Sequence, residues 1–232
     1  MKELDGKPLP PVIIGIAGGS GSGKTTVALR VREACPGQTI QIIHHDSYYH
    51  DNSHLPLEKR AQINYDHPNA FETTLLVEHL QALREGQSVQ VPKYDYAIHS
   101  RLKETKLVEP ADIVFVEGIL VLESPELRRL MDIRLYIDVD ADERVLRRMK
   151  RDVTKRGRTM ESVMDQYLNV VRPMHLQFVW PSKRYAHLII PEGGFNRVAI
   201  DLIATKIQNI IRERDRMRDL GQEINKAKSE ET

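Results

Sequence analysis

The sequence contains a single cysteine and no long hydrophobic run, and each shortage excludes a class of protein. Cys35 is the only cysteine in 232 residues, so no disulfide can form within the chain, which suits a reducing cytosol. No stretch approaches the ~20 apolar residues of a membrane-spanning helix, because Glu117 interrupts the apolar segment 113–122. The N-terminus has no apolar signal region. We therefore expect a cytoplasmic protein without a membrane-embedded part.

An excess of charge of one sign is also lacking. The chain has 34 Lys and Arg against 33 Asp and Glu, a net charge of +1, so its charge gives no reason to expect nucleic acid or an anionic membrane. The one strongly basic segment, residues 147–158, contains no aromatic residues, which argues further against nucleic acid. With 41% hydrophobic and 29% charged residues, the composition is that of an ordinary globular protein.

A glycine-rich motif is the most informative feature that the sequence does contain. Residues 18–25 read G-G-S-G-S-G-K-T and match the phosphate-loop pattern G-x-x-x-x-G-K-[ST] at every defined position. An apolar run precedes the motif and apolar residues at helical spacing follow it, so it joins a strand to a helix. Backbone N–H groups and the helix N-terminus then face phosphate oxygens, while Lys24 reaches the β- and γ-phosphates and Thr25 holds Mg²⁺. The predicted nucleotide-binding residues are Gly18, Gly19, Ser20, Gly21, Ser22, Gly23, Lys24, Thr25 and Thr26.

Strand and helix patterns alternate along the chain. Strands are expected at 12–17, 39–43, 113–116, 133–137 and 188–190, and helices at 75–83, after Ser124, from Asp140 or Asp142, at 160–171 and at 198–211. This alternation predicts an α/β protein with a parallel β-sheet covered by helices on both faces, the phosphate-loop (P-loop) NTPase fold. Segments 89–93 and 102–108 predict a β-hairpin flap, and residues 151–160 an arginine-rich lid. We expect one domain over residues 1–211 and a charged tail, frayed or disordered, over 212–232.

Several further segments carry a resemblance to a known family. They are His45-Asp46-Ser47-Tyr48-Tyr49, Asn64-Tyr65-Asp66-His67-Pro68, Pro92-Lys93-Tyr94-Asp95-Tyr96 with His99-Ser100-Arg101, Phe115-Val116-Glu117-Gly118-Ile119-Leu120, Lys150-Arg151-Asp152-Val153 with Arg156-Gly157-Arg158, and Gln166-Tyr167 with Val171-Arg172-Pro173-Met174. Together with the phosphate loop, they make the chain from about Val12 to Ile211 resemble the bacterial uridine (uridine-cytidine) kinases. The resemblance implies transfer of the γ-phosphoryl of ATP or GTP to the 5′-hydroxyl of uridine or cytidine, giving UMP or CMP in pyrimidine salvage. It also implies a homotetramer and feedback inhibition by CTP or UTP.

The resemblance assigns roles to the residues expected to act on the transferred phosphoryl group and on Mg²⁺. The chemistry of each side chain fits its role. Asp46 follows the second strand, at the sheet edge where open α/β sheets bind ligands, so its carboxylate can accept the 5′-hydroxyl proton and contact Mg²⁺. Glu117 ends an apolar strand and suits the second acidic element that acts on Mg²⁺. Lid arginines would neutralise the charge of the transferred phosphoryl group. The expected catalytic residues are Asp46, Lys24, Arg151 and Arg156, and the expected metal ligands are Thr25, Glu117 and Asp46.

The nucleoside-side roles follow from the same resemblance. Asp66 is expected to accept hydrogen bonds from the ribose 2′- and 3′-hydroxyls, so a deoxyribose would leave it short of a partner. Tyr94 and His99 match the base readers, since a hydroxyl and an imidazole can each donate or accept. Tyr65 and Tyr96 are candidates for stacking on the pyrimidine ring. The expected substrate-binding residues are Asp66, Tyr94, Tyr96, His99, Arg148, Arg158 and Gln166.

Other interpretations of these residues stay open. Asp46 could instead cap a helix, Asp66 could be a turn residue, and the aromatic residues, Tyr65 above all, could pack in the core. The histidines at 44, 45, 50 and 54 suggest a structural zinc site as another interpretation, although no cysteine lies near them in the sequence. A GTPase-type switch would need an Asn-Lys-x-Asp motif, which the Asn-Lys pair at 225–226 does not complete.

Two relatives of the same superfamily, phosphoribulokinase and pantothenate kinase, are further alternatives for the activity. The sequence also departs from the family pattern at His187, and Phe195 lies in a segment where family members vary. These positions leave the choice between ATP and GTP open.

Overall fold

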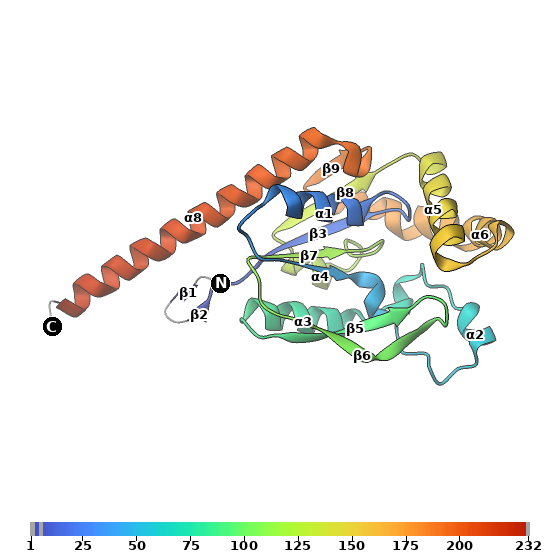
Figure 1. Cartoon of the computed structure of the whole chain (residues 1–232), viewed down its shortest axis with the longest axis horizontal. Helices are drawn as coiled ribbons and strands as arrows, with labels where there is room; N and C mark the ends of the chain where they lie inside the picture. The colour runs from blue at the N-terminus through green and yellow to red at the C-terminus, as the bar shows by residue number, and fades with distance from the viewer. Residues whose placement is uncertain (1–2, 5–6, 231–232) are drawn as a thin grey trace.

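A five-stranded parallel β-sheet lies at the centre of the computed structural model, which describes residues 3–4 and 7–230 (Figure 1). The strand order is β4 (Ile40–His44), β7 (Ile113–Glu117), β3 (Val12–Gly18), β8 (Ile133–Asp138) and β9 (Leu188–Pro191). All four strand pairs are parallel. Every residue of β3 and β7 is buried, which explains why both read as uninterrupted apolar runs rather than as alternating patterns. The predicted fold class is therefore confirmed.

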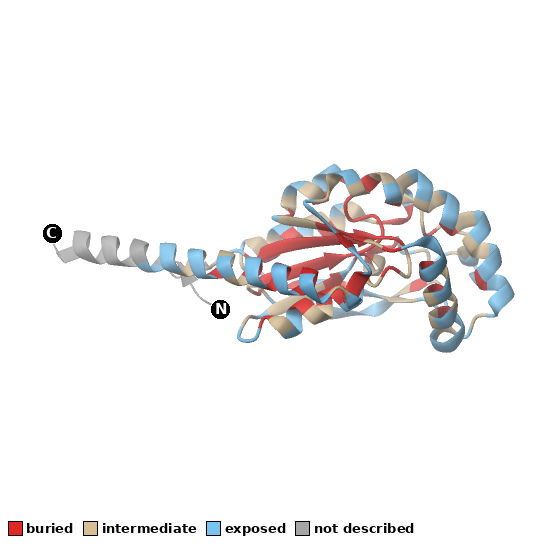
Figure 2. Ribbon diagram, turned by 90° about the horizontal axis from the view of Figure 1, so that it is seen from above, coloured by how far each residue is buried: buried red, intermediate tan, exposed pale blue. Residues whose placement is uncertain are grey.

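Helices cover both faces of this sheet. On one face, α1 (Lys24–Ala34) and α8 (Arg197–Glu230) pack against Ile14 and Ile16 of β3. On the other face, α3 (Thr73–Arg84) and α4 (Pro125–Leu130) pack against Ile13 and Ala17. Alternate residues of one strand thus serve two separate cores, and Figure 2 shows the strands as the most continuously buried part of the molecule.

The expected hairpin is present beside the sheet. Strands β5 (Val89–Asp95) and β6 (Ser100–Val108) pair antiparallel, with a register shift between Pro92 and Tyr94. The chain reaches the hairpin from β4 through 3₁₀ turn η1 (His45–Tyr48), α2 (Leu57–Ala61), 3₁₀ turn η2 (Pro68–Ala70) and α3. A short pair of strands, β1 (Glu3–Leu4) and β2 (Lys7–Pro8), precedes the sheet.

A second helical layer begins after β8. Helix α5 (Ala141–Arg156) ends at Gly157, which has a left-handed φ of 64°. Helix α6 (Met160–Gln166) follows and continues through η3 (Tyr167–Val171), α7 (Arg172–Met174), η4 (His175–Val179) and η5 (Trp180–Tyr185). The turn η6 (Gly193–Phe195) then joins β9 to α8. The predicted lid segment therefore comprises the last turns of α5 and the turn into α6.

The structure differs from one expectation about the charged tail. Residues 212–230 belong to α8, which continues without a break to Glu230 and extends beyond the body of the molecule (Figure 1), whereas residues 231–232 lie outside the described residues. Residues 212–228 are mostly good helix formers and contain no proline, which explains the continuation. Across residues 3–4 and 7–230, no helix is long and apolar enough to cross a membrane.

Candidate active site

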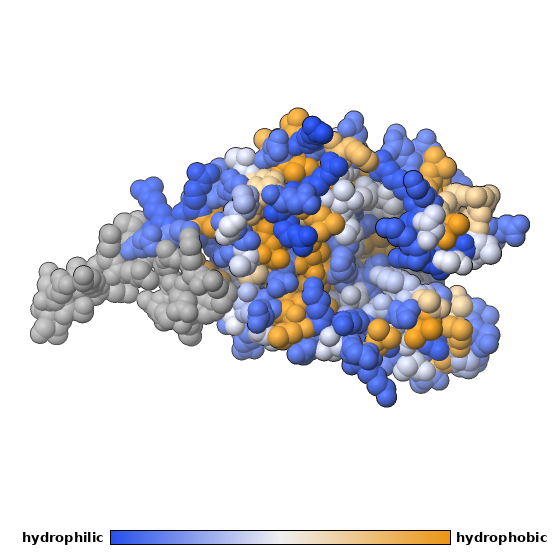
Figure 3. Space-filling view, viewed as in Figure 1, coloured by the Kyte–Doolittle hydropathy of each residue, from blue (hydrophilic) through white to orange (hydrophobic). Residues whose placement is uncertain are grey.

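A cavity of about 600 Å³ opens at the carboxyl ends of β3, β4 and β7. The hairpin and the α5–α6 region border it, and Figure 3 shows the surface hollowed between these two parts. The predicted site residues that line the cavity are Ser20, Lys24, Thr25, Asp46, Asp66, Tyr94, Tyr96, His99, Glu117, Arg148, Arg151, Arg156, Arg158 and Gln166. The chain therefore brings residues from both predicted halves of the site, phosphate and nucleoside, to one place.

The phosphate loop connects β3 to α1 at the floor of the cavity. Gly21 has a φ of 82°, and a Cβ atom there would lie 2.3 Å from the carbonyl oxygen of Arg144, so only glycine fits. The Nζ atom of Lys24 donates hydrogen bonds to the carbonyl oxygens of Gly18 and Gly19, each at 3.1 Å. Burial lowers the pKa of Lys24, while the nearby carboxylates of Glu117 and Asp46 oppose that shift. A cation held this way can turn toward an incoming phosphate.

Arg144 supports the loop from behind and was not expected from the sequence. Its side chain is almost completely buried, its Nε atom donates to the carbonyl of Val139 at 2.9 Å, and a Cβ atom on Gly19 would lie 2.4 Å from its Nη1 atom. Its Nη2 atom lies 3.3 Å from Nε2 of His175. Because arginine can only donate, the imidazole accepts and is neutral in this contact. No sequence motif marks either residue.

The carboxylate of Glu117 connects the phosphate loop to the end of β4. Its Oε1 atom accepts hydrogen bonds from the Thr25 hydroxyl at 2.8 Å and from Nδ1 of His44 at 2.6 Å. Burial alone would raise the pKa of Glu117, but the hydrogen bond from His44 and the charge of Lys24 lower it below its ordinary value. An ionised carboxylate beside a hydroxyl is a set of oxygen donors that suits Mg²⁺. His44 is a neighbour of this site that the sequence did not indicate.

The two predicted aspartates face the cavity from different loops. Asp46 lies in η1 directly after β4, and the N-cap position of that turn is His44, so the capping role is not the one that Asp46 plays. Burial, followed by the charge of Glu117, raises the pKa of Asp46. Burial also raises the pKa of Asp66, although the charge of Arg148 opposes it. Both carboxyl groups therefore hold a proton more readily than exposed aspartates do.

Aromatic rings form the wall beneath the hairpin. Tyr65 and His99 are stacked at 5.5 Å between ring centroids, and Tyr49 packs edge-on against Tyr65 and Tyr94 at 4.9 and 5.0 Å. Tyr65 is also part of the hydrophobic core, as the alternative interpretation of this residue allowed. His99 has a left-handed φ of 47° at the turn of the hairpin, a conformation that non-glycine residues adopt mainly where the surroundings impose it.

Arginines line the opposite side of the cavity. Arg148 donates to the Ser20 hydroxyl in the phosphate loop and to Oε1 of Gln166, both at 2.8 Å, and Arg158 donates to the same Gln166 oxygen. Arg148 therefore touches both sides of the expected site, not the nucleoside side alone. The guanidinium of Arg156 lies 4.3 Å from the ring centroid of Tyr96 and so contacts the hairpin.

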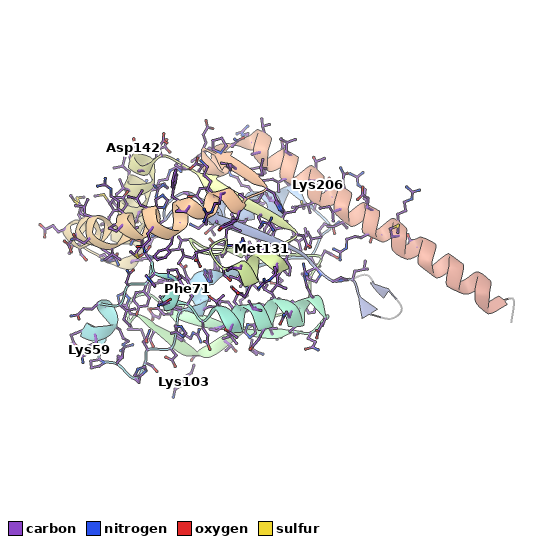
Figure 4. The ribbon with its side chains drawn as sticks, turned by 180° about the vertical axis from the view of Figure 1, so that it is seen from behind. Lys59, Phe71, Lys103, Met131, Asp142 and Lys206 are labelled. Atoms are coloured by element: carbon purple, nitrogen blue, oxygen red, sulfur yellow. The ribbon has the colours of Figure 1, made fainter. Side chains whose placement is uncertain are left out.

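The adjacent histidines of the 44–54 segment point to different places. His44 turns toward Glu117, whereas His45 is buried and stacks on Phe71 at 4.0 Å between ring centroids. Phe71 lies in the interior of the molecule (Figure 4). Within the ranges that the structure describes, no three His, Cys, Asp or Glu side chains gather in a way that could hold a metal ion, so the structure offers no support for the zinc site raised above.

Residues 13–199 match the phosphoribulokinase/uridine kinase family. The chain belongs to this family. Among family relatives, the uridine kinase of Halalkalibacterium halodurans is 58% identical over 204 residues, covering 88% of this chain and 97% of the relative. The uridine kinase of Clostridium perfringens is 56% identical over 201 residues, covering 87% of this chain and 97% of the relative. The resemblance to bacterial uridine kinases is thus confirmed.

Solved structures of other kinases share the fold. A putative fructose transport system kinase from Silicibacter has a TM-score of 0.61 at 20% identity, covering 81% of this chain and 93% of that chain. Phosphoribulokinase from Rhodobacter spheroides has a TM-score of 0.59 at 17% identity, covering 78% and 70%. At these identities the likeness supports the P-loop kinase fold of the family and nothing more specific.

Proposed function

We propose that this protein is a pyrimidine ribonucleoside kinase, which transfers the γ-phosphoryl of ATP or GTP to the 5′-hydroxyl of uridine or cytidine. One observation carries the proposal: the phosphate loop, two partly buried aspartates, a tyrosine–histidine wall and four arginines share a single cavity. The identity of 56–58% to proteins named uridine kinase supports the same activity. Residues 1–211 form the kinase domain in this proposal, with residues 151–160 as its lid.

The triphosphate binds the phosphate loop in the proposed complex. Backbone N–H groups of residues 18–26 and the N-terminus of α1 hold the phosphate oxygens, and Lys24 leaves the carbonyls of Gly18 and Gly19 to contact the β- and γ-phosphates. Thr25, Glu117 and Asp46 would hold Mg²⁺, which neutralises phosphate charge when bound. Arg151 and Arg156 reach the γ-phosphoryl from the other side of the cavity.

Asp46 acts on the acceptor hydroxyl. As the bond from the 5′-oxygen to the γ-phosphorus forms and the bond to the β,γ-bridging oxygen breaks, the hydroxyl proton passes to the Asp46 carboxylate. The raised pKa of Asp46, caused first by burial, makes its carboxylate a better proton acceptor than an exposed aspartate. Closure of the arginine-bearing elements would exclude water, which otherwise competes with the nucleoside.

The nucleoside lies between the hairpin and α5–α6 in this proposal. Asp66 accepts hydrogen bonds from the ribose 2′- and 3′-hydroxyls, Tyr94 and His99 contact the edge of the base, and Tyr96 stacks on its face. Arg148, Arg158 and Gln166 are already linked to each other and close this side. Because the base readers can donate or accept, uracil and cytosine both fit.

A panel of acceptors with γ-labelled ATP tests the proposal. Label should appear on the 5′-oxygen of uridine and cytidine, and GTP should replace ATP as donor. If label passes instead to ribulose 5-phosphate or pantothenate while both nucleosides stay unlabelled, the activity is that of another member of the superfamily. Slow hydrolysis that no acceptor changes would indicate a nucleotide-dependent switch.

The remaining expectations belong to the same proposal, and the first two of them rest on the resemblance alone. They are a homotetramer, feedback inhibition by CTP or UTP, and action in the cytoplasm on free nucleosides, without nucleic acid or membrane partners. Sedimentation of the purified chain and inhibition assays with both triphosphates test the first two.

A further inference from the structure

The buried face of α5 is polar, which is unusual for a helix that packs against a protein. Its buried residues are Arg144, Arg148 and Asp152, spaced four apart on one face, while Leu146 is largely exposed. Asp152 is fully buried, with an exposed fraction of 0%. It does not line the cavity, yet a buried carboxylate is costly unless positive partners surround it.

Three of the four cavity arginines surround the Asp152 carboxylate. Its Oδ1 atom accepts a hydrogen bond from Nε of Arg151 at 2.8 Å and lies 3.3 Å from Nη1 of Arg156. Its Oδ2 atom lies 3.6 Å from Nε of Arg148. Arg151, followed by Arg148 and Arg156, lowers the pKa of Asp152 although burial would raise it, so the carboxylate is ionised in the folded protein.

The fourth arginine is placed by the backbone of the same residue. The carbonyl oxygen of Asp152 accepts hydrogen bonds from the N–H groups of Gly157 and Arg158, the latter at 3.2 Å. This pair of bonds ends α5 and turns the chain so that Arg158 enters the cavity. A single residue therefore touches or fixes all four arginines.

We propose that Asp152 is the positioning residue for the four cavity arginines, including Arg151 and Arg156, which reach the transferred phosphoryl group. The proposal rests on the proposed function only for the identity of the acceptor. The part that concerns triphosphate binding does not depend on which acceptor is used. With one negative charge among three guanidiniums, two positive charges remain to face the triphosphate. The carboxylate fixes their directions, which matters because charge stabilisation in the transition state depends on geometry as well as on charge.

One pair of facing atoms in this cluster does not form a hydrogen bond. Within the part of the chain that the structure describes, Nε of Arg148 and Oδ2 of Asp152 are both buried without a hydrogen-bond partner, and they face each other at 3.6 Å. Arg148 meanwhile donates to Ser20 of the phosphate loop. If a phosphate takes the place of that Ser20 contact, a small rotation of Arg148 completes the bond to Asp152, which couples triphosphate binding to the arginine cluster.

A double-mutant cycle on the full chain tests the positioning role without any acceptor. The four proteins are wild type, Asp152→Asn, Arg156→Gln and the double variant, and the readout is the Kd of inorganic tripolyphosphate with Mg²⁺ by calorimetry. Asn keeps the size and the backbone bonds of Asp152 but loses its charge. Arg156→Gln should weaken binding about tenfold in the wild-type background and less than threefold in the Asp152→Asn background, because an arginine that is no longer positioned contributes less.

The single variant separates positioning from net charge, because the positioning role predicts that Asp152→Asn alone raises the Kd of tripolyphosphate, by less than threefold. Removing one negative charge near the cavity should tighten tripolyphosphate binding if Asp152 only sets the net charge. The matched control is Asp142→Asn, the same charge change on an exposed residue at the other end of α5 (Figure 4), and Arg156→Gln should weaken binding by the same factor with or without it.

The kinetic arm measures kcat with uridine. Asp152→Asn should lower kcat at least tenfold while the Kd of tripolyphosphate changes less than threefold. Equal factors for Arg156→Gln in both backgrounds, or a kcat within twofold of wild type, would overturn the positioning role. Asp152→Ser serves as a second variant, and failure of both variants to fold would make the residue structural and overturn the proposal as well. If the wild type does not phosphorylate uridine, the proposed function is rejected. The positioning role of Asp152 is then tested by the tripolyphosphate double-mutant cycle alone, which needs no acceptor.

Discussion

The hydroxyl of Thr25 donates a hydrogen bond of 2.8 Å to Oε1 of Glu117, across 92 positions of sequence. Thr25 ends the phosphate loop and Glu117 ends the neighbouring strand β7, whose parallel pairing with β3 brings the two together. The same carboxylate oxygen also accepts from His44 at the end of β4, the next strand in the sheet. The neighbouring positions of β4, β7 and β3 in the sheet therefore bring His44, Glu117 and Thr25 together, and Glu117 and Thr25 are two of the three proposed Mg²⁺ ligands.

Replacing this carboxylate should affect the metal more than the nucleotide. In Glu117→Gln an amide oxygen can still accept from Thr25 or His44, so the fold is kept, but the negative charge that a divalent cation needs is lost. We predict that the Mg²⁺ concentration for half-maximal activity rises at least tenfold at saturating ATP and uridine. Glu104→Gln on the exposed surface of β6 is the control. A Mg²⁺ titration that superimposes on that of wild type would remove Glu117 from the metal site.

The ribose role of Asp66 makes a prediction about selectivity. A hydrogen bond to a charged group contributes about 1.5–3 kcal/mol, so Asp66→Ala should raise the KM for uridine by roughly 10- to 100-fold and leave the KM for ATP within twofold. Wild type should also use 2′-deoxyuridine poorly, and the variant should lose most of that preference. An unchanged KM for uridine, or a preference for uridine that the variant keeps in full, would contradict the role.

His175 should make stability depend on pH. Burial, and then the charges of Arg144 and Lys24, lower the pKa of His175 to about 4, whereas an unfolded histidine titrates near 6.5. Between these values the unfolded chain binds more protons than the folded one, so this group reduces stability as pH falls through that window. After allowance for its partial exposure, wild type should lose about 1 kcal/mol more than His175→Gln between pH 7.5 and 5.

Urea unfolding of both proteins at the two pH values measures this difference. Gln keeps an oxygen that can accept from Arg144 but does not titrate in this range. His54→Gln, at an exposed position, is the control and should lose as much stability as wild type. If His175→Gln and wild type lose the same free energy of unfolding, His175 is not held neutral by its surroundings.

The central strands β3 and β7 could be predicted from the sequence because they are buried on both faces. Ile13 and Ile14 are adjacent and both completely buried, so β3 reads as an unbroken apolar run next to the phosphate loop. Most of the cavity residues could be predicted because they lie in short motifs that the family resemblance covers, whereas His44 lies outside those motifs. Those motifs meet because parallel strands place their carboxyl ends at one edge of the sheet.

The supporting residues could not be predicted, since their roles arise from packing between distant segments. Asp152 stands in a run of charged residues in which any member could be exposed, and only the packing of α5 determines which one is buried. Arg144 is marked by no motif, and its place behind Gly19 depends on how α5 meets the phosphate loop. The continuation of α8 could not be predicted for a different reason: a strongly charged segment is typical of disorder, although most of the residues of this one favour helix.

Substitution of Asp46 tests the central claim most directly, because that claim assigns one partly buried carboxylate to the acceptor hydroxyl and not to the binding of ATP. The measurement is kcat with uridine alongside the Kd of ATP, for wild type and Asp46→Asn. Loss of a positioned general base should lower kcat by about 10²- to 10⁴-fold while the Kd of ATP stays within about threefold. A variant with near wild-type kcat would contradict the account, and so would a loss of activity that comes entirely from weaker ATP binding.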